Sequence, residues 1–244
     1  MSEQPSTDLA QSEDKPLSMP QAIGKAAIGL AIFAVVTAGL IALTQVNTAE
    51  RIEEEIRKAR SKALLEITPA TEHDNDLLND AFWLQAKELG LSEPAETFVA
   101  KQSGQIHSLI LPVIAPQGYS GPIRLIVGLT TEGAIKGVRV VEHRETPGLG
   151  DKIETKKSDW ISSFEGRSLD NTPEEDWRVK KDGGAFDQLT GATITPRAIV
   201  QSVYAALKFY QSNREDLLTT APGMAFQVKK EESTDSASAE SVAR

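Results

Sequence analysis

A long, uncharged apolar stretch near the N-terminus constrains this chain more than any other feature. Residues 26–49 hold no charged side chain, and most of them form the run AAIGLAIFAVVTAGLIAL. As a helix this stretch would be about 36 Å long. The hydrocarbon core of a bilayer is about 30 Å thick, and a helix of about 20 residues spans it. Nothing else in the chain is apolar enough to enclose such a helix. The sequence therefore predicts a transmembrane helix over residues 23–45.

The apolar stretch has two interpretations, a cleaved signal peptide and an uncleaved anchor. A signal peptide begins with a short basic segment, but here a long segment precedes the stretch and contains only Lys15 and Lys25 beside several acids. The apolar part is also too long, and Asn47 is a poor residue three positions before a cut after Ala49. We therefore expect an anchor that crosses the membrane once.

The charges beside the anchor do not decide its orientation. Two basic residues precede it, and five Lys and Arg residues follow within residues 51–62, so a simple count would place the bulk of the chain in the cytoplasm. Four glutamates lie among residues 50–55, however, and long domains are translocated largely regardless of charge. Both orientations stay open on composition.

Composition excludes several classes of function. The chain of 244 residues has a formal net charge of −9, which argues against binding to a nucleic-acid backbone. It contains no cysteine, so thiolate-bound Fe–S clusters, thiol catalysis and disulfides are excluded. His73, His107 and His143 are far apart in the sequence and form no local metal-binding motif. Any redox chemistry must come from an organic cofactor.

The remainder of the chain is predicted to be an α+β domain. A helical pattern near residues 76–89 is followed by apolar segments bounded by short turns, which favours a mainly antiparallel sheet flanked by helices. A final amphipathic helix follows the predicted strands. The expected strands are residues 97–101, 106–114, 123–129 and 135–141, and the final helix is residues 196–212.

The segment Lys180–Val200, KKDGGAFDQLTGATITPRAIV, has two interpretations. In one, Thr195 caps the final helix with Pro196 in its first turn, and the glycines merely form loops. In the other, small residues and threonine hydroxyls before a helix N-terminus accept a phosphate-bearing ligand. The segment is not a P-loop, because no Gly-Lys-Thr or Gly-Lys-Ser is present. The residues alone do not decide between the two.

A second segment, EHRETPGLGDK over residues 142–152, follows a predicted strand. Pro147, Gly148 and Gly150 would make a tight loop that can lie against a flat ring, and His143 and Glu145 share a side if the strand continues. The simpler interpretation is a Pro-Gly turn with a surface histidine, since one His-x-Glu is weak evidence for a metal or a general base.

Together, the two segments resemble the FMN-binding domain family. The residues DQLTGAT at 187–193 match the flavin-attachment motif D-x-x-[S/T]-G-A-T, and HRETPGLG at 143–150 resembles the flavin-facing loop of that family. Within the family, the chain is most similar to the G subunits of Rnf-type (Rsx) ion-translocating oxidoreductase complexes. The resemblance covers about residues 20–215.

The resemblance implies a covalent FMN and a set of site residues. Thr193 would bear the FMN through a phosphoester to its side-chain oxygen, formed by a separate flavin transferase that uses FAD. No residue would be catalytic in its own right, and none would bind a metal. The other cofactor-binding residues it implies are Asp187, Thr190, Gly191 and Ala192 around the threonine; His143, Glu145, Thr146, Pro147, Gly148, Leu149 and Gly150 against the ring; and Lys181, Gly183 and Gly184 on the phosphate side.

The resemblance also implies a location and partners. The FMN domain would lie on the periplasmic side of a bacterial inner membrane. It would relay electrons, without substrate turnover of its own, together with the A, B, C, D and E subunits of a complex that couples ferredoxin/NAD electron transfer to Na⁺ or H⁺ translocation. The expected division is a disordered segment 1–22, the transmembrane helix 23–45, a helical linker 46–95, the FMN-binding domain 96–215 and a tail 216–244.

Two alternatives are open at this point. One is the equivalent C subunit of a sodium-pumping NADH:quinone reductase, which shares the flavin-facing loop and the attachment motif. The other is an anchored assembly module without redox chemistry, whose threonine-rich loop only caps a helix.

Overall fold

A computed structural model describes residues 19–227 of the chain, in two units divided after Ile56. The predicted disorder of residues 1–18 and the C-terminal residues 228–244 lie outside the described part; residues 19–22 are helical.

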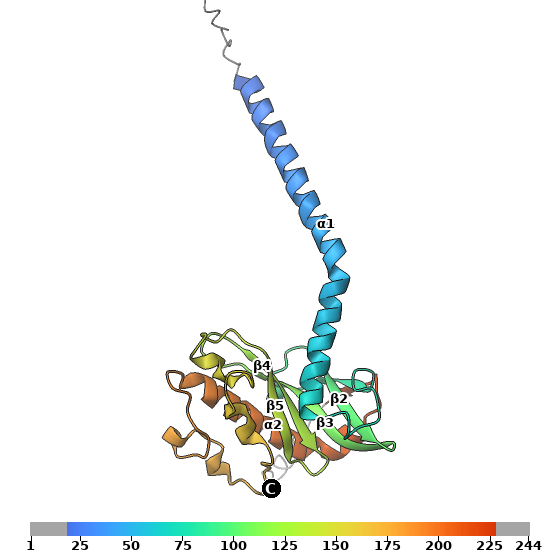
Figure 1. Ribbon diagram of the computed structural model, residues 1–244, viewed down its shortest axis with the longest axis vertical. Coiled ribbons are helices and arrows are strands. Elements are labelled where there is room, and N and C mark those ends of the chain that lie inside the picture. The colour runs from blue at the N-terminus through green and yellow to red at the C-terminus, as the bar shows by residue number, and fades with distance from the viewer. Residues whose placement is uncertain (1–18, 228–244) are drawn as a thin grey trace, which may run out of the picture. The chain divides into compact units, whose positions relative to one another are not determined.

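Helix α1 (Met19–Ile67) begins in the first unit and carries the apolar stretch (Figure 1). Its segment Ile23–Gln45 has a mean hydropathy of 2.5, and none of its most apolar window is buried by the protein. Thr37 and Thr44 donate their hydroxyl hydrogens to the carbonyls of Phe33 and Leu40, both at 2.8 Å. These bonds satisfy the polar groups within the helix, as an apolar surrounding requires. By length and composition this helix can cross a membrane.

The second unit, residues 57–227, is built on one six-stranded sheet in the order β5-β4-β3-β2-β1-β6. The four consecutive pairs are antiparallel, and β6 pairs with β1 in parallel. This confirms the predicted α+β class and the mainly antiparallel sheet. The strands are β1 (Ala81–Gln85), β2 (Ala95–Gln102), β3 (Gln105–Ala115), β4 (Ile123–Thr130), β5 (Ile135–Glu142) and β6 (Ala225–Gln227).

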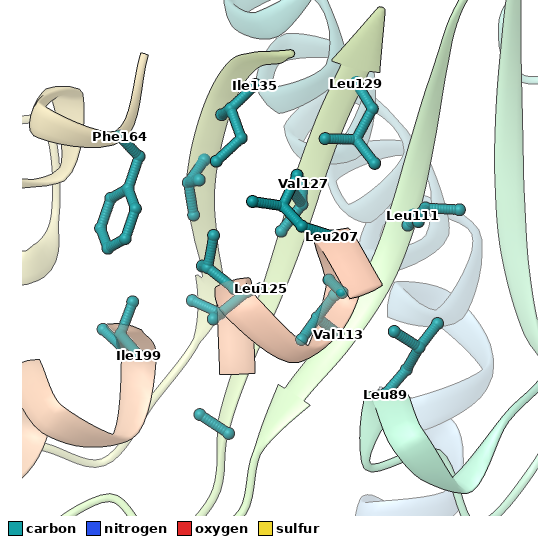
Figure 2. Close-up of a cluster of buried hydrophobic side chains, with 14 of the residues drawn as sticks. Leu89, Leu111, Val113, Leu125, Val127, Leu129, Ile135, Phe164, Ile199 and Leu207 are labelled. Atoms are coloured by element: carbon teal, nitrogen blue, oxygen red, sulfur yellow. The ribbon is translucent and has the colours of Figure 1, made fainter. Parts of the chain in front are cut away.

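Helix α2 (Ile194–Thr219) lies across one face of the sheet (Figure 1). Because side chains alternate along a strand, Leu109, Leu111 and Val113 of β3 all join the core beneath this helix. Figure 2 shows Ile199 and Leu207 of α2 in the same core as Leu111, Leu125 and Val127 of the sheet. The large core fixes α2 on the sheet, and with it the helix start that follows the DQLTGAT motif.

The opposite face has a smaller core under the last turns of α1. Leu64 and Ile67 pack with Phe98, Ile110 and Ile126 from the sheet. The approach is close at Gly128, where an added Cβ would lie 2.1 Å from Cγ2 of Ile67. The end of α1 is thus an integral part of the second unit.

The predicted helix near residues 76–89 is wrong. Residues 81–85 form strand β1, and only Lys87–Leu89 make a short 3₁₀ helix, which ends at Gly90 with φ +73°. Phe82 and Leu84 alternate into the core while Trp83 and Gln85 face outward. Pairing with β2 therefore overrides the local helix propensity of this segment. Strand β6 was not predicted either, and both strands lie outside residues 96–215.

Four short 3₁₀ helices occupy the connection between β5 and α2. They are η2 (Gly150–Ile153), η3 (Trp160–Phe164), η4 (Glu174–Asp176) and η5 (Lys180–Asp182). Phe164 and Trp177 anchor this connection in the main core beside Phe186. The connection thereby places the end of β5 and the start of α2, which carry the two sequence motifs, within one packed unit.

Candidate functional site

The two motif segments, well separated in the sequence, meet in the structure. The loop after β5 contacts the turn before α2 where Leu149 packs on Gly191. A Cβ added at Gly191 would lie 2.7 Å from Cδ2 of Leu149, and Gly191 has φ +82°, which favours glycine. The structure therefore brings together the DQLTGAT motif and the predicted flavin-facing loop.

The buried carboxylate of Glu145 links the two motif segments on the inner side of the site. Glu145 is 4% exposed; its Oε1 accepts the backbone N–H of Ser120 at 3.0 Å, and its Oε2 accepts the hydroxyl hydrogen of Thr195. Ser120 belongs to the loop between β3 and β4, whereas Thr195 lies in the first turn of α2. Glu145 thus joins three separate segments and points inward.

The side chain of His143 also makes hydrogen bonds that hold its own loop. Its Nδ1 accepts the backbone N–H of Glu145 at 3.0 Å, so the proton of the neutral ring belongs on Nε2. Nε2 lies 3.0 Å from Oε1 of Glu154, to which it donates. With both ring nitrogens engaged, His143 orients the loop.

Asp151 is a buried acid that the sequence analysis did not select. It directly follows Gly150 and is 5% exposed. The Gly148 backbone N–H lowers the pKa of Asp151, the nearby Lys157 adds to this effect, and burial opposes it. The Lys157 Nζ lies 3.5 Å from the Asp151 Oδ2. The ionised form of this buried carboxylate is therefore favoured beside the turn at Gly148.

The loop is divided into an inner and an outer set of residues. Glu145, Gly150 and Asp151 are buried, whereas Thr146 to Leu149 are exposed. Leu149, at 41% exposure, offers a large apolar side chain to the surface beside Gly191. Among the residues predicted to face the flavin ring, this outer set is free to meet a ligand, and His143 and Glu145 support it.

Thr193 is placed at the start of α2 as its N-cap, and its side chain makes no capping hydrogen bond. It is partly buried, and the preceding turn is closed by the bond from Ala192 N to Leu189 O at 3.0 Å. The interpretation with Thr195 as the cap is wrong, because Thr195 lies inside the first turn, is fully buried and bonds to Glu145. The hydroxyl at the helix start is that of Thr193.

Asp187, the first residue of the motif, is held through both its backbone and its side chain. Its carbonyl accepts the indole N–H of Trp160 at 2.7 Å, and its Oδ1 lies 2.5 Å from Lys180 Nζ. The ion pair is exposed, so its contribution is small, whereas Trp160 is 8% exposed. Trp160 thus fixes the beginning of the DQLTGAT segment.

The segment Lys180–Gly184 is tied to the first turn of α2. Asp182 accepts two hydrogen bonds from Arg197, both at 2.6 Å, and this pairing lowers the pKa of Asp182. At Gly184 a Cβ would lie 2.1 Å from the carbonyl oxygen of Arg178, so no larger residue fits. Gly183, at φ +85°, and Lys181 are exposed beside it.

Two supporting residues, Asp151 and Trp160, were missed by the sequence analysis as parts of the site, and Thr195 was given the wrong role. The role of each depends on a partner or on burial that the sequence does not show. A polar residue directly after GLG, as Asp151 is, was the one local signal available. All three residues are buried. They support the exposed residues of the site and do not replace any of them.

The arrangement can hold an organic phosphate ester and offers no metal site. Within residues 19–227, no group of three or more acidic or histidine side chains is arranged to bind a metal ion. The start of α2 supplies backbone N–H groups and a positive dipole end, which favour a phosphate. The free hydroxyl of Thr193 and the adjacent exposed apolar side chain of Leu149 suit a phosphate-linked ligand with a flat ring.

Comparison with known proteins agrees with this geometry. Residues 118–208 match the FMN-binding domain family, and residues 19–67 match the RnfG N-terminal region. The chain is 50% identical over 193 residues to the G subunit of the ion-translocating oxidoreductase complex of Pseudomonas aeruginosa (strain UCBPP-PA14), covering 79% of this chain and 90% of the relative. It is 43% identical over 200 residues to the protein of the same name from Vibrio atlanticus (strain LGP32), covering 82% and 96%.

Proposed function

The chain belongs to the family of G subunits of the ion-translocating oxidoreductase complex and contains that family's FMN-binding domain, and from this premise we propose that it carries FMN covalently on Thr193. The observation that carries the proposal is the free hydroxyl at the start of α2. FMN, when bound, supplies reversible electron transfer. The protein itself is expected to hold and orient the cofactor.

Comparison of the three threonines of the motif region favours Thr193. Thr195 is fully buried and committed to Glu145, and Thr190 is exposed in the turn, away from the helix start. A phosphate on Thr193 would meet the N-terminus of a 26-residue helix, where the dipole contributes about 0.3–1 kcal/mol for an anion. We propose that a separate flavin transferase forms the ester, using FAD and releasing AMP.

The outer face of the flavin-facing loop is proposed to meet the ring. Thr146, Pro147, Gly148 and Leu149 are exposed beside Gly191. A phosphate link leaves the ring electronics unchanged, so the protein would tune the potential through hydrogen bonds and solvent access around the ring. Lys181, Gly183 and Gly184 are proposed to line the phosphate side, because Asp182 and Arg197 tie their segment to the first turn of α2.

We further propose that Ile23–Gln45 anchors the protein in a bacterial inner membrane with the FMN domain on the periplasmic side. The 23 residues of the segment would span about 35 Å as a helix, enough for a hydrocarbon core of about 30 Å. The side is proposed from the family resemblance. In this position the protein would relay electrons with the A, B, C, D and E subunits, between ferredoxin and NAD, while the complex moves Na⁺ or H⁺.

The test is the mass of the full chain after co-expression with the flavin transferase. Covalent FMN adds about 438 Da, the mass of FMN less water, and peptide mapping is expected to place it on Thr193. Thr193→Val should remove the adduct, and the control Thr190→Ser, which keeps the hydroxyl that the motif specifies, should retain it. An unmodified chain would favour an anchored assembly module, and an adduct at another residue would refute the assignment.

The alternative of a quinone reductase C subunit is not favoured, because the relatives matched over most of their length are G subunits of the oxidoreductase complex. Co-purification of the native protein with quinone reductase subunits would reverse this conclusion.

A further inference from the structure

The buried pair of Thr195 and Glu145 lies directly beneath the proposed flavin site. Thr195 is two residues after Thr193, and Glu145 is four residues before Leu149. Both are nearly or fully buried, at 0% and 4% exposure, and the hydroxyl of Thr195 donates to Oε2 of Glu145. We infer that this pair is a positioning device that sets the flavin-facing loop against the attachment threonine; the inference rests on the proposed function.

The carboxylate of Glu145 lies close to two glycines, Gly150 and Gly118. A Cβ added at Gly150 would lie 2.7 Å from Oε2 of Glu145 and 3.1 Å from Oγ1 of Thr195. On the other side, a Cβ at Gly118 would lie 3.0 Å from Oε1 of Glu145 and 2.2 Å from the carbonyl oxygen of Gly121. The carboxylate is therefore enclosed between two glycines, and its position defines the spacing of the segments around it.

The hydroxyl of Thr195 matters because a buried carboxylate needs its hydrogen bonds. Glu145 has two donors, the backbone N–H of Ser120 and the hydroxyl of Thr195, and the second lies in the first turn of α2. A buried charge that loses a donor is costly. Without the hydroxyl, the carboxylate is expected to turn toward water and to carry residues 143–150 away from the start of α2.

Such a movement would act on the flavin without contact between the pair and the cofactor. Thr195 is fully buried, so it is a support for Thr193 and not a ligand. The contact of Leu149 with Gly191 depends on the same spacing. Loss of the pair should therefore expose the flavin ring to solvent and reduce attachment, whereas a purely structural role would lower stability alone.

The experiment compares Thr195→Val with Thr195→Ser in the full chain, co-expressed with the flavin transferase and purified in detergent. Valine keeps the shape and removes the hydroxyl; serine restores it. The matched control is Thr68→Val, which removes another fully buried hydroxyl, 3.3 Å from Ser108 Oγ on β3. The measurements are the fraction of chain bearing FMN by mass, quenching of flavin fluorescence by iodide, and the thermal midpoint.

We expect Thr195→Val to reduce the FMN-bearing fraction or to increase the iodide quenching constant, because loss of one hydrogen bond can shift the balance between the closed and the open loop by roughly five- to tenfold. Thr195→Ser should behave as the wild type, and Thr68→Val should change the thermal midpoint only. Glu145→Gln, which keeps the side-chain shape, should shift the flavin readouts in the same direction and serves if Thr195→Val does not fold.

The inference is overturned if Thr195→Val or, where that variant does not fold, Glu145→Gln matches the wild type in both flavin readouts, or if Thr68→Val changes them equally. These outcomes leave the proposed function intact, because the wild type still carries FMN. A wild-type chain without covalent FMN would instead overturn the proposed function, and this inference with it.

Discussion

The apolar segment of α1 and the sheet unit treat their apolar side chains in opposite ways. In Ile23–Gln45 the most apolar window is wholly unburied by the protein, whereas in residues 57–227 the apolar side chains form a continuous core between the sheet and α2. The first region needs an apolar environment outside the protein to cover its side chains, whereas the second buries its apolar side chains in its own core. The difference teaches that location and fold are set by separate parts of the chain, which the following changes test.

The largest effect is expected from charges in the apolar segment. Ile32→Arg combined with Val36→Arg places two arginines near the middle of the helix, at about 2.5–3.5 kcal/mol each. The variant should leave the carbonate-resistant membrane fraction, while the thermal midpoint of the sheet unit is unchanged. Ile32→Leu with Val36→Leu is the control and should stay in the membrane fraction. Retention of the double-arginine variant would show that the segment does not anchor the protein.

Truncation of a core side chain should destabilise the sheet unit and leave the membrane fraction unchanged. Phe164 is fully buried, 4.5 Å from the ring centroid of Phe186 and 5.6 Å from that of Trp160. Phe164→Ala should lower the free energy of unfolding by about 3–5 kcal/mol, measured by tryptophan fluorescence in urea, without changing the membrane fraction. Val141→Ala, at a half-exposed position, should cost far less. Equal losses for both would contradict the assignment of this core.

A smaller, local effect is expected at the contact between the two loops. Gly191→Ala forces alanine into the left-handed region, at about 1–2 kcal/mol, and displaces Leu149. Gly166→Ala, outside the candidate site, carries the same backbone penalty at φ +76°, and no atom lies within 4 Å of its added Cβ. The excess loss of FMN attachment in Gly191→Ala over Gly166→Ala therefore reports on the turn where Leu149 packs. Equal FMN-bearing fractions in the two variants would mean that this contact is irrelevant to the cofactor.

The smallest effect is a pH dependence at Asp151. Its pKa in the folded protein lies below the value near 3.9 usual for an unfolded chain. The ionised carboxylate therefore contributes stability above about pH 3.9 that is lost as pH falls through the folded pKa. The thermal midpoint of Asp151→Asn should lie below that of the wild type at pH 7, and the gap should close in acid. A gap that is constant with pH would contradict this role.

Local patterns predicted the parts of the fold whose signals are local. Strands β2 to β5 follow from alternation and short turns, and α2 follows from its apolar face. Strand β1 was mistaken for helix because Leu77, Leu78 and Ala81 with Leu84 fit a helical period; the neighbouring strand β2 decided otherwise. β6 is only three residues long, and pairing with β1 alone makes it a strand.

The same division holds for the candidate site. The motifs identified the family, which the comparisons confirm, and placed Thr193 near a helix start, but they did not distinguish its environment from that of Thr195. The roles of Glu145 and Thr195 depend on a hydrogen bond between residues 50 positions apart. Neither motif predicts this hydrogen bond, because in the sequence Glu145 looks like an ordinary loop residue and Thr195 like an ordinary capping residue.

By itself, then, the sequence determined that the chain has one apolar segment long enough for a membrane, an α+β domain and the two motifs of an FMN-binding family. Hydropathy and periodicity are properties of neighbouring residues, so they can be recognised without a structure. Only the tertiary structure decided which threonine is free at the start of α2 and which is bound below it. That choice depends on burial and on hydrogen-bond partners from distant segments, which exist only once the sheet has brought those segments together.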